Sequence, residues 1–400
     1  MQKIQAALLV ASLFLGACGT TPRTEPPVSC APCAACPTCP APIAPPPVSF
    51  SRQLQASTWG ELPGWAEDDH AAAWGAFLQS CRGVASKPNG TAWKRVCDLA
   101  KTTNGSSART ARQFFETQLK PYLVVAADGS SSGMITGYYE PLLRGSRQPG
   151  KGFDQPVRGV PDDLLTIDLS AVFPELKDKR LRGRLEGNKV VPYWSRAEIA
   201  AHGDKLPSRN LLYVDDAVEL FFLQVQGSGR VRLPDGSLVR LGYADQNGYP
   251  YQSIGRVLVE RGELKLEDAS MQGIQNWARA HPSRLEELLN TNPSYVFFRE
   301  VPNSKDGPLG ALGVPLTAER SIAVDPRSVP LGTPVFLATT RPNSTQAMNR
   351  LVLAQDTGGA IKGAVRADFF WGFGKEAGEQ AGKMKQSGKL WLLLPPEAAP

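Results

Sequence analysis

The stretch that decides the fold is Arg366-Ala367-Asp368-Phe369-Phe370-Trp371-Gly372, in which one acidic side chain stands among apolar and aromatic residues. Such an apolar run predicts a buried strand. It lies in a β-rich region over residues 321–394, interrupted by a glycine-rich segment near 376–387 that we expect to be helical. Strands that are short and evenly spaced favour barrels over an open parallel sheet.

The same pattern of short strands continues toward the N-terminus, mixed with helices. Turn pairs such as Asp128-Gly129 and Asn247-Gly248 separate the strands, and Pro234-Asp235-Gly236 predicts a hairpin over residues 231–241. Strands are predicted at 123–126, 134–139, 217–225, 231–233, 238–241 and 295–298, and helices at 68–99, 253–261, 266–280 and 283–289. We therefore expect a mainly β protein with some helices, and 400 residues allow two or three domains.

The first 17 residues have the features of a lipoprotein signal peptide. Lys3 provides a positive start, and residues 6–15 form an apolar segment that is too short to span a bilayer. Leu15-Gly16-Ala17-Cys18 resembles the bacterial lipobox, in which cleavage precedes the cysteine and the thiol is acylated. A plain signal peptide with a chance cysteine is the alternative. Because Gly19 replaces the aspartate that marks inner-membrane retention, we expect a lipid anchor at Cys18 on the periplasmic face of the outer membrane.

Residues 18–50 form a proline-rich linker. Proline enforces extended geometry, so about 30 such residues could reach up to roughly 90 Å from the lipid. The linker also carries four cysteines at a spacing of three: Cys30, Cys33, Cys36 and Cys39. An exported, proline-rich segment does not suit the iron–sulfur cluster that this spacing resembles, and we expect no cofactor. Crosslinking between chains and drift in a tolerant linker both stay open.

The remaining two cysteines, Cys81 and Cys97, lie in the helical segment 68–99. An isolated pair so close in sequence is expected to form a disulfide in an oxidising periplasm.

Three aspartates are the candidates for catalysis. Asp325, Asp356 and Asp368 each lie directly against the apolar residues of a predicted strand. A carboxyl group in that position is paired, caps a turn, or stays protonated because burial raises its pKa. A carboxylic acid that is protonated near neutral pH can donate its proton to a leaving group. Asp368 has the most apolar flank and is the expected acid, although a turn cap or a structural hydrogen bond would explain each aspartate alone.

Other chemistries fit the sequence poorly. Asp356-Thr357-Gly358 spells the aspartic-protease triplet, but that mechanism needs two such aspartates. Gln226-Gly227-Ser228-Gly229 lacks the full dinucleotide-binding pattern and leads into a strand, so a tight turn near a ligand fits better. The three histidines lack the spacing of metal ligands, and we expect no metal site. A net charge of +6 without a block of basic residues makes nucleic acid a poor partner.

Four separated motifs resemble one known family. They are Thr136-Gly137-Tyr138-Tyr139-Glu140-Pro141, Val225-Gln226-Gly227-Ser228-Gly229, Gly242-Tyr243-Ala244 with Asn247-Gly248, Tyr251 and Ser253-Ile254-Gly255, and Gln355-Asp356-Thr357-Gly358-Gly359-Ala360-Ile361-Lys362-Gly363. In this order they resemble the membrane-bound lytic murein transglycosylase A family, and the region of the three aspartates resembles the 3D domain that ends that family. The resemblance covers about residues 126–394.

The resemblance implies an architecture and a site. A double-psi β-barrel is expected from residues 51–140 and 299–395, with the 3D region at about 315–394. A second β-barrel domain is expected at 141–298, with a glycan groove between the two. Asp368 is implied as the catalytic acid, supported by Asp325 and Asp356. The candidate substrate-binding residues in the matching motifs are Thr136, Tyr138, Gln226, Gly227, Ser228 and Lys362.

The implied activity is lytic cleavage of peptidoglycan glycan strands by a carbon–oxygen lyase, and we expect the protein to be a monomer. Asp368 would protonate the β-1,4 bond between N-acetylmuramic acid and N-acetylglucosamine, and the sugar's own 6-hydroxyl would close a 1,6-anhydro ring. Two alternatives stay open: a hydrolase that uses Glu140 to activate water, and a wall-binding lipoprotein without activity. Tyr138, Tyr139 and Trp371 could stack on sugars or belong to the core.

Overall fold

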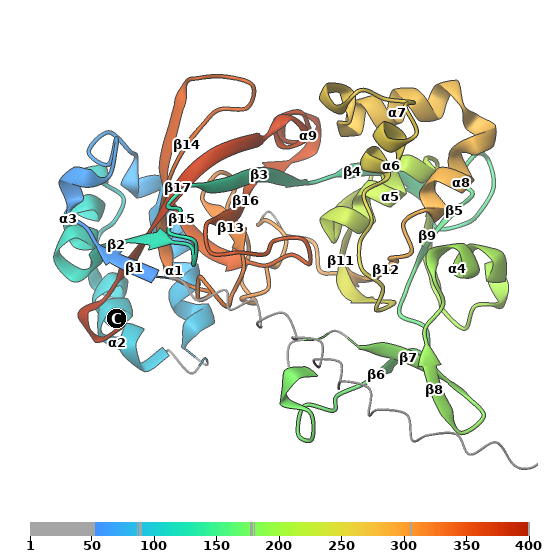
Figure 1. Cartoon of the computed structure of the whole chain (residues 1–400), viewed down its shortest axis with the longest axis horizontal. Helices are drawn as coiled ribbons and strands as arrows, with labels where there is room; N and C mark the ends of the chain where they lie inside the picture. The colour runs from blue at the N-terminus through green and yellow to red at the C-terminus, as the bar shows by residue number, and fades with distance from the viewer. Residues whose placement is uncertain are drawn as a thin grey trace, which may run out of the picture. The chain divides into compact units, whose positions relative to one another are not determined.

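The structure is a computed structural model that describes residues 53–398, apart from 86, 88–89, 177–178, 180 and 305. The described residues belong to one compact unit, Ser49–Pro400 (Figure 1). The signal segment, Cys18 and the four linker cysteines lie outside the described residues. Within the described ranges, no helix is both long enough and apolar enough to cross a membrane.

Six strands form a closed ring because the long strand β17 pairs with β14 and also with β3. The order round the ring is β3, β16, β13, β15, β14 and β17. The bounds of these strands are β3 (Gly133–Glu140), β13 (Ser321–Val324), β14 (Pro334–Thr340), β15 (Ala347–Asp356), β16 (Arg366–Phe373) and β17 (Lys385–Leu394). Strands β2 (Lys120–Val125) and β1 (Gln53–Ala56) extend the sheet beyond β17. This ring agrees with the expected barrel, whereas its double-psi connectivity stays a prediction.

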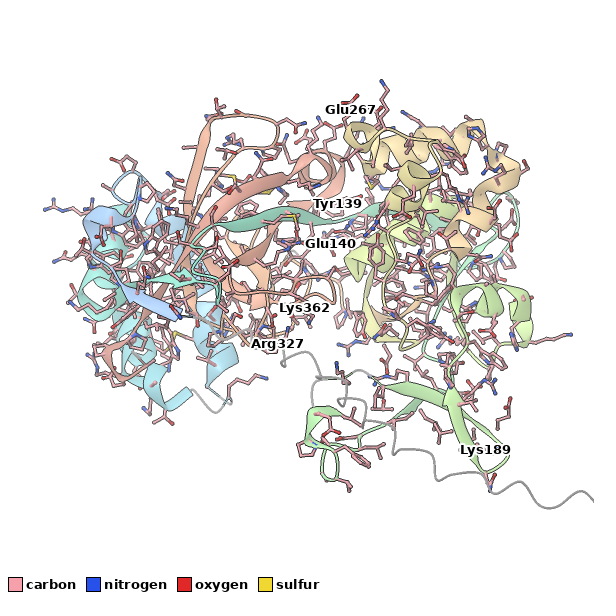
Figure 2. All side chains as sticks on the ribbon, viewed as in Figure 1. Tyr139, Glu140, Lys189, Glu267, Arg327 and Lys362 are labelled. Carbon is pink, nitrogen blue, oxygen red and sulfur yellow. A yellow bond between two sulfur atoms is a disulfide. The ribbon has the colours of Figure 1, made fainter. Side chains whose placement is uncertain are left out.

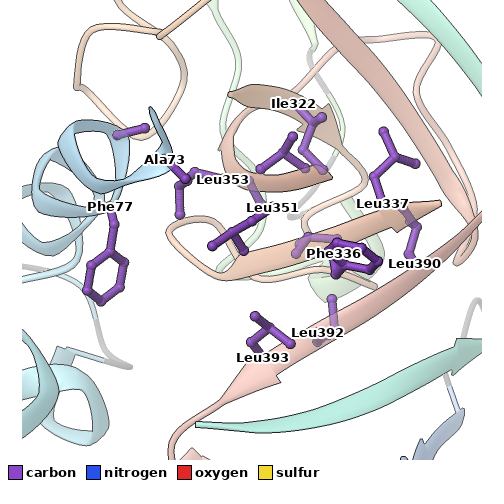
Figure 3. Packing of buried hydrophobic residues seen from close by; sticks show 14 of the residues in the cluster. Ala73, Phe77, Ile322, Phe336, Leu337, Leu351, Leu353, Leu390, Leu392 and Leu393 are labelled. Carbon is purple, nitrogen blue, oxygen red and sulfur yellow. The ribbon is translucent and has the colours of Figure 1, made fainter. Parts of the chain in front are cut away.

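The main hydrophobic core joins this ring to the helices beside it. Phe336 and Leu337 of β14 and Leu390 of β17 are fully buried, as are the neighbouring leucines of β15 (Figure 3). The first residues of β14 and the last residues of β17 are buried on both faces of the strand. They consequently have continuous apolar runs rather than an alternating pattern.

Three helices lie before the ring in sequence: α1 (His70–Val84), α2 (Gly90–Thr102) and α3 (Ala108–Gln118). Asp69 and Ser107 cap α1 and α3 by accepting hydrogen bonds from backbone amides. Cys81 of α1 and Cys97 of α2 form a disulfide. The single helical segment expected over 68–99 is therefore two helices, and the proline in the sequence between them explains the break.

The second sheet has six strands in the order β12-β11-β10-β4-β9-β5, all drawn from the chain between Leu142 and Val301. Its strands are β4 (Leu142–Ser146), β5 (Gln155–Arg158), β9 (Asn210–Val214), β10 (Ser228–Arg232), β11 (Leu238–Gln246) and β12 (Val296–Val301). The hairpin expected over 231–241 is confirmed as β10 and β11. The boundary expected at residue 298 falls inside β12, which pairs with β11 through Val301.

Four helices accompany this sheet: α5 (Ala217–Gln226), α6 (Ile254–Glu260), α7 (Met271–Ala280) and α8 (Leu285–Asn290). They share a separate core cluster that includes Phe221, Leu258 and Trp277. A small three-stranded sheet follows β5 in sequence and is formed by β6 (Leu165–Thr166), β7 (Arg182–Glu186) and β8 (Lys189–Pro192). Helix α4 (Arg196–His202) comes next.

Two elements differ from those expected from the sequence: one is a helix instead of a strand, and one helix ends earlier. Residues 217–225 were expected to form a strand, but they form α5, which is buried and therefore apolar on most sides. A buried helix and a buried strand cannot be separated by hydrophobicity alone. The decisive signals were the cap residues, since Asp216 accepts from Val218 and Glu219 and Gly227 ends the helix. Helix α9 (Gly374–Lys383) ends earlier than 387, because the following residues pair with β3 as part of β17.

Candidate active site

Neighbouring strands of the ring bring two of the three aspartates to one place. Ala323 of β13 faces Asp356 of β15 on one side and Asp368 of β16 on the other. On the far side of β16, Asp368 faces Thr136 of β3. Asp325 follows directly after β13. The register therefore explains how residues far apart in sequence meet in one site.

Asp368 is held mainly by a single side chain. The hydroxyl of Thr136 donates to Oδ1 of Asp368 at 2.6 Å. Burial raises the pKa of Asp368 to about 6, against the opposing effects of the Thr136 hydrogen bond and the Arg366 charge, and with a further increase from Asp356. The residue as a whole is half-buried rather than fully buried. A carboxyl group with these properties keeps its proton in mildly acidic solution and can transfer it.

Asp356 is tied to the backbone and to a tyrosine. Its Oδ1 accepts from the amide of Ala311 at 2.9 Å, and its Oδ2 accepts from the hydroxyl of Tyr138 at 3.1 Å. Burial raises the pKa of Asp356 despite these hydrogen bonds. Burial also raises the pKa of Tyr138 well above its usual value, and the charges of Asp356 and Asp368 add to that increase. Tyr138 therefore stays protonated and donates to Asp356.

Asp325 has a different environment from the other two. Its side chain is fully buried, and it accepts hydrogen bonds from the guanidinium and amide of Arg327 and from the amide of Gly363. Burial raises the pKa of Asp325, but these hydrogen bonds outweigh it, and the pKa lies below its ordinary value. Asp325 is therefore an ionised group that ties the loop after β13 to the loop after β15.

The other candidate residues lie along β3 and in two turns. Gln226 accepts a hydrogen bond from the amide of Tyr139 through its Oε1 at 3.1 Å, one residue beyond Tyr138. Gly227 has a φ of +78°, which a side chain would oppose, and the chain then enters β10 at Ser228. Lys362 is exposed and precedes Gly363, which contacts Asp325 (Figure 2). Thus Thr136 and Tyr138 contact the aspartates directly, whereas Gln226 contacts only the backbone of β3, next to Tyr138.

The structure adds residues that sequence reasoning did not single out. Arg366 donates to the hydroxyl oxygen of Thr136 at 2.8 Å, and it lies two residues before Asp368 on the same strand. This spacing places the two side chains on one face of β16, which could have been recognised from the sequence. Arg230 forms an ion pair with Glu140 at 2.9 Å and also lies over the ring of Phe373. Nothing in the local sequence around Glu140 indicates this partner.

The aromatic candidates for stacking on sugars are largely buried. Tyr138 packs against Phe370, and the Tyr139 hydroxyl contacts the sulfur of Met271. The Trp371 indole nitrogen contacts the sulfur of Met384. Their burial in this structure assigns their rings to packing. The described residues contain no group of three or more His, Cys, Asp and Glu side chains arranged to hold a metal ion.

The sequence matches two family profiles. One is described as the MltA specific insert domain and matches residues 134–299. The other is described as the 3D domain and matches residues 320–394. Membrane-bound lytic murein transglycosylase A of Escherichia coli K12 is 35% identical over 296 residues, which cover 72% of each chain. The protein of the same name from Vibrio cholerae is 30% identical over 76% of this chain and 81% of its own length.

Solved structures are similar over most of the chain. A crystal structure of MltA from Neisseria gonorrhoeae is 40% identical, with a TM-score of 0.77, and the match covers 87% of this chain and 94% of that one. A structure of Escherichia coli MltA with bound chitohexaose is 31% identical, with a TM-score of 0.61 and coverage of 80% and 90%. Sequence and fold therefore agree on the same set of relatives.

Proposed function

This chain belongs to the membrane-bound lytic murein transglycosylase A family, and on that premise we propose that it cleaves the glycan strands of peptidoglycan. The bond broken is the β-1,4 link between N-acetylmuramic acid and N-acetylglucosamine. The new chain ends are 1,6-anhydromuramic acid. The relative with bound chitohexaose supports binding of an extended sugar chain by this fold.

The proposed mechanism uses one carboxyl group twice. Asp368 protonates the glycosidic oxygen, the bond to the muramoyl C1 breaks, and positive charge develops at that carbon. The sugar's own 6-hydroxyl then attacks C1, and the ionised Asp368 takes the hydroxyl proton. An intramolecular nucleophile is already close to its target, so no water need be held for attack. The pKa of Asp368, which burial raises to about 6, supports its role as the acid.

The remaining site residues have supporting parts in this proposal. Asp325 and Asp356 fix the loops and the strand that surround Asp368. Gln226, Gly227, Ser228 and Lys362 are proposed to contact the glycan, since a left-handed glycine turn allows close approach and an exposed ammonium can donate to hydroxyl groups. Thr136 and Tyr138 are proposed to border the bound sugar through the hydroxyls that hold the aspartates. The groove between the two sheets stays a prediction.

The environment of Glu140 argues against the hydrolase alternative. A general base must be close to an attacking water, but Glu140 is 1% exposed. Its Oε2 accepts from Arg230 at 3.0 and 2.9 Å, while its Oε1 has no partner and no access to solvent. The environment of Glu140 therefore suits a buried structural ion pair rather than a base that activates water. Digestion of purified sacculi distinguishes the enzyme from a wall-binding lipoprotein without activity.

We also propose where the enzyme works. Relatives named as membrane-bound support membrane association. The finer proposal is a lipid on Cys18, in the outer membrane and facing the periplasm, with the monomeric catalytic part reaching the wall through the linker 18–50. The lipid on Cys18 and the reach of the linker rest on the sequence alone, since these residues lie outside the described ranges.

Digestion of purified sacculi tests the mechanism. The wild type should release fragments with 1,6-anhydromuramic ends, which weigh one water less than hydrolysis products in mass spectrometry. The variant Asp368→Asn should fold and bind glycan but lose at least about 10²–10⁴-fold in turnover, as expected for removal of a general acid. Asp98→Asn, on the exposed surface of α2, is the matched control and should cut normally.

Mainly reducing muramic ends would contradict the lyase mechanism and favour the hydrolase. A well-folded wild type that binds sacculi without cutting them would favour the wall-binding protein. Full activity in Asp368→Asn would remove Asp368 from the mechanism.

A further inference from the structure

Three side chains on one face of the ring form a continuous hydrogen-bonded series. Arg366 and Asp368 lie two residues apart on β16, and Thr136 lies opposite Asp368 on β3. Nη2 of Arg366 donates to Oγ1 of Thr136 at 2.8 Å. Oγ1 of Thr136 in turn donates to Oδ1 of Asp368 at 2.6 Å. Within the described residues, Arg366 donates to Thr136 and to two backbone carbonyl oxygens rather than directly to Asp368.

The direction of this series follows from the chemistry of its members. A guanidinium group can only donate hydrogen bonds, so Oγ1 of Thr136 must accept from Arg366. A hydroxyl group has one proton, and in the contact with Asp368 Thr136 is the donor, so that proton is directed to Oδ1. With a lone pair of Oγ1 engaged by Arg366, the hydroxyl is oriented toward Oδ1, which acts as an acceptor. When Asp368 is protonated, its own proton is therefore favoured on the other oxygen, Oδ2.

We propose that Arg366 is a positioning residue that acts through Thr136 to keep the transferable proton of Asp368 on Oδ2. The inference rests on the proposed role of Asp368 as the acid. It goes further by assigning the two carboxyl oxygens different tasks. Oδ1 is the fixed acceptor, and Oδ2 gives the proton to the glycosidic oxygen and later receives the proton of the 6-hydroxyl.

The intervening Thr136 hydroxyl also explains why the nearby Arg366 cation does not keep Asp368 ionised. A direct bidentate pair with arginine would strongly favour the ionised carboxylate. Thr136 separates the charges, so the effect of Arg366 on the pKa of Asp368 is smaller than the effect of burial. The other ionisable groups that face Asp368 are Asp356 of β15, which raises its pKa, and Tyr138 of β3, whose hydroxyl is directed to Asp356.

A purely structural role for Arg366 is the competing explanation. Its Nη1 donates to the carbonyl oxygens of Met134 and Ala367, so it also joins β3 to β16. Loss of activity in one variant would not separate the two roles. A double-mutant cycle with Thr136 does, because an effect transmitted through the hydroxyl disappears when the hydroxyl is absent.

The test compares Thr136→Ser, Thr136→Val, Arg366→Met and the double variant Thr136→Val/Arg366→Met. Turnover on glycan strands is measured at about pH 4.5, where Asp368 is protonated in all variants and its pKa no longer affects the rate. We expect Thr136→Ser, which keeps the hydroxyl, to be clearly faster than Thr136→Val. Thr136→Val and Arg366→Met should each lower kcat about tenfold with KM nearly unchanged. The double variant should also lose about tenfold rather than about a hundredfold.

Independent losses that multiply in the double variant would overturn the inference, as would a Thr136→Ser variant as slow as Thr136→Val. A second measurement needs no substrate: carboxyl ¹³C NMR follows the titration of Asp368. Removing the Thr136 hydroxyl or the Arg366 cation should raise the pKa of Asp368, because both lower it in the wild type. If the pKa of Asp368 is unchanged in Arg366→Met, the proposed coupling between Arg366 and Asp368 is refuted, even where the wild type is inactive. An inactive wild type alone would refute only the proposed function.

Discussion

Replacing Glu140 by glutamine should destabilise the protein strongly while leaving its reaction intact. Glu140 is 1% exposed, and its partner Arg230 is 14% exposed in the side chain. The pair has two N–H donors on one carboxylate oxygen. Removing one member of such a buried pair leaves the other charge uncompensated, which costs about 3–5 kcal/mol. Because glutamine keeps a carbonyl acceptor near Arg230, we expect the lower end, about 3 kcal/mol.

Urea unfolding measures this loss. With a slope of about 3 kcal/mol/M, the midpoint should fall by about 1 M. Arg230→Gln should cost a similar amount, and the double variant should cost less than the sum of the two. Glu260→Gln is the matched control, because its pair with Arg256 is exposed and contributes at most about 0.5 kcal/mol.

The activity of Glu140→Gln, measured well below its unfolding transition, separates structure from chemistry. It should still release anhydro ends at a rate close to that of the wild type. An unchanged urea midpoint would refute the assignment of the pair to stability. A stable variant that no longer cuts would return Glu140 to the reaction.

Four further predictions concern the pH dependence of activity, the pH dependence of stability, the disulfide and the anchor. The reaction needs protonated Asp368, so kcat/KM should fall as pH rises through about 6, and a fall on acidification through that pH would contradict the assignment. Folding raises the pKa of Asp368, so the free energy of unfolding should decline as pH rises from the pKa of the unfolded carboxyl to about 6. Above that range the wild type buries an ionised carboxylate, and Asp368→Asn should therefore unfold at a higher temperature than the wild type. Removing the disulfide in Cys81→Ala/Cys97→Ala should cost roughly 3 kcal/mol for a loop of this length, and unfolding at an unchanged denaturant concentration would show that the link constrains little. Cys18→Ala should leave the outer-membrane fraction, and a variant that still floats with those membranes would exclude the lipid anchor.

The sequence predicted those parts of the fold that depend on local pattern. The hairpin of β10 and β11 followed from its proline-aspartate-glycine turn, and the Cys81–Cys97 bond of the structure matches the pairing suggested by the sequence. The helix α5 was missed because hydrophobic residues cover most of its surface, which removes the periodic signal. Its two cap residues carried the missing information.

The sequence supplied candidate residues for the site, which stay predictions, whereas their contacts came from the structure. The flank of Asp368 indicated a buried acid, and burial does raise its pKa. The sequence could not assign different environments to Asp325 and Asp356, because these depend on Arg327, Gly363 and Tyr138 in three dimensions. The pairing of Glu140 with Arg230 joins residues 90 positions apart, and only the folded chain shows it.

The long separation along the chain between β3 and its partners has a consequence for how the protein matures. Thr136 and Asp368 are 232 residues apart, whereas the six strands of the second sheet all come from the segment between them. Contacts of such high sequence separation form slowly, and chains generally fold from the parts that are made first. The segment between can fold while the last strands are still being synthesised. The proposed acid, its threonine and the closing strand β17 come together only afterwards, so an incompletely synthesised chain lacks the assembled candidate site.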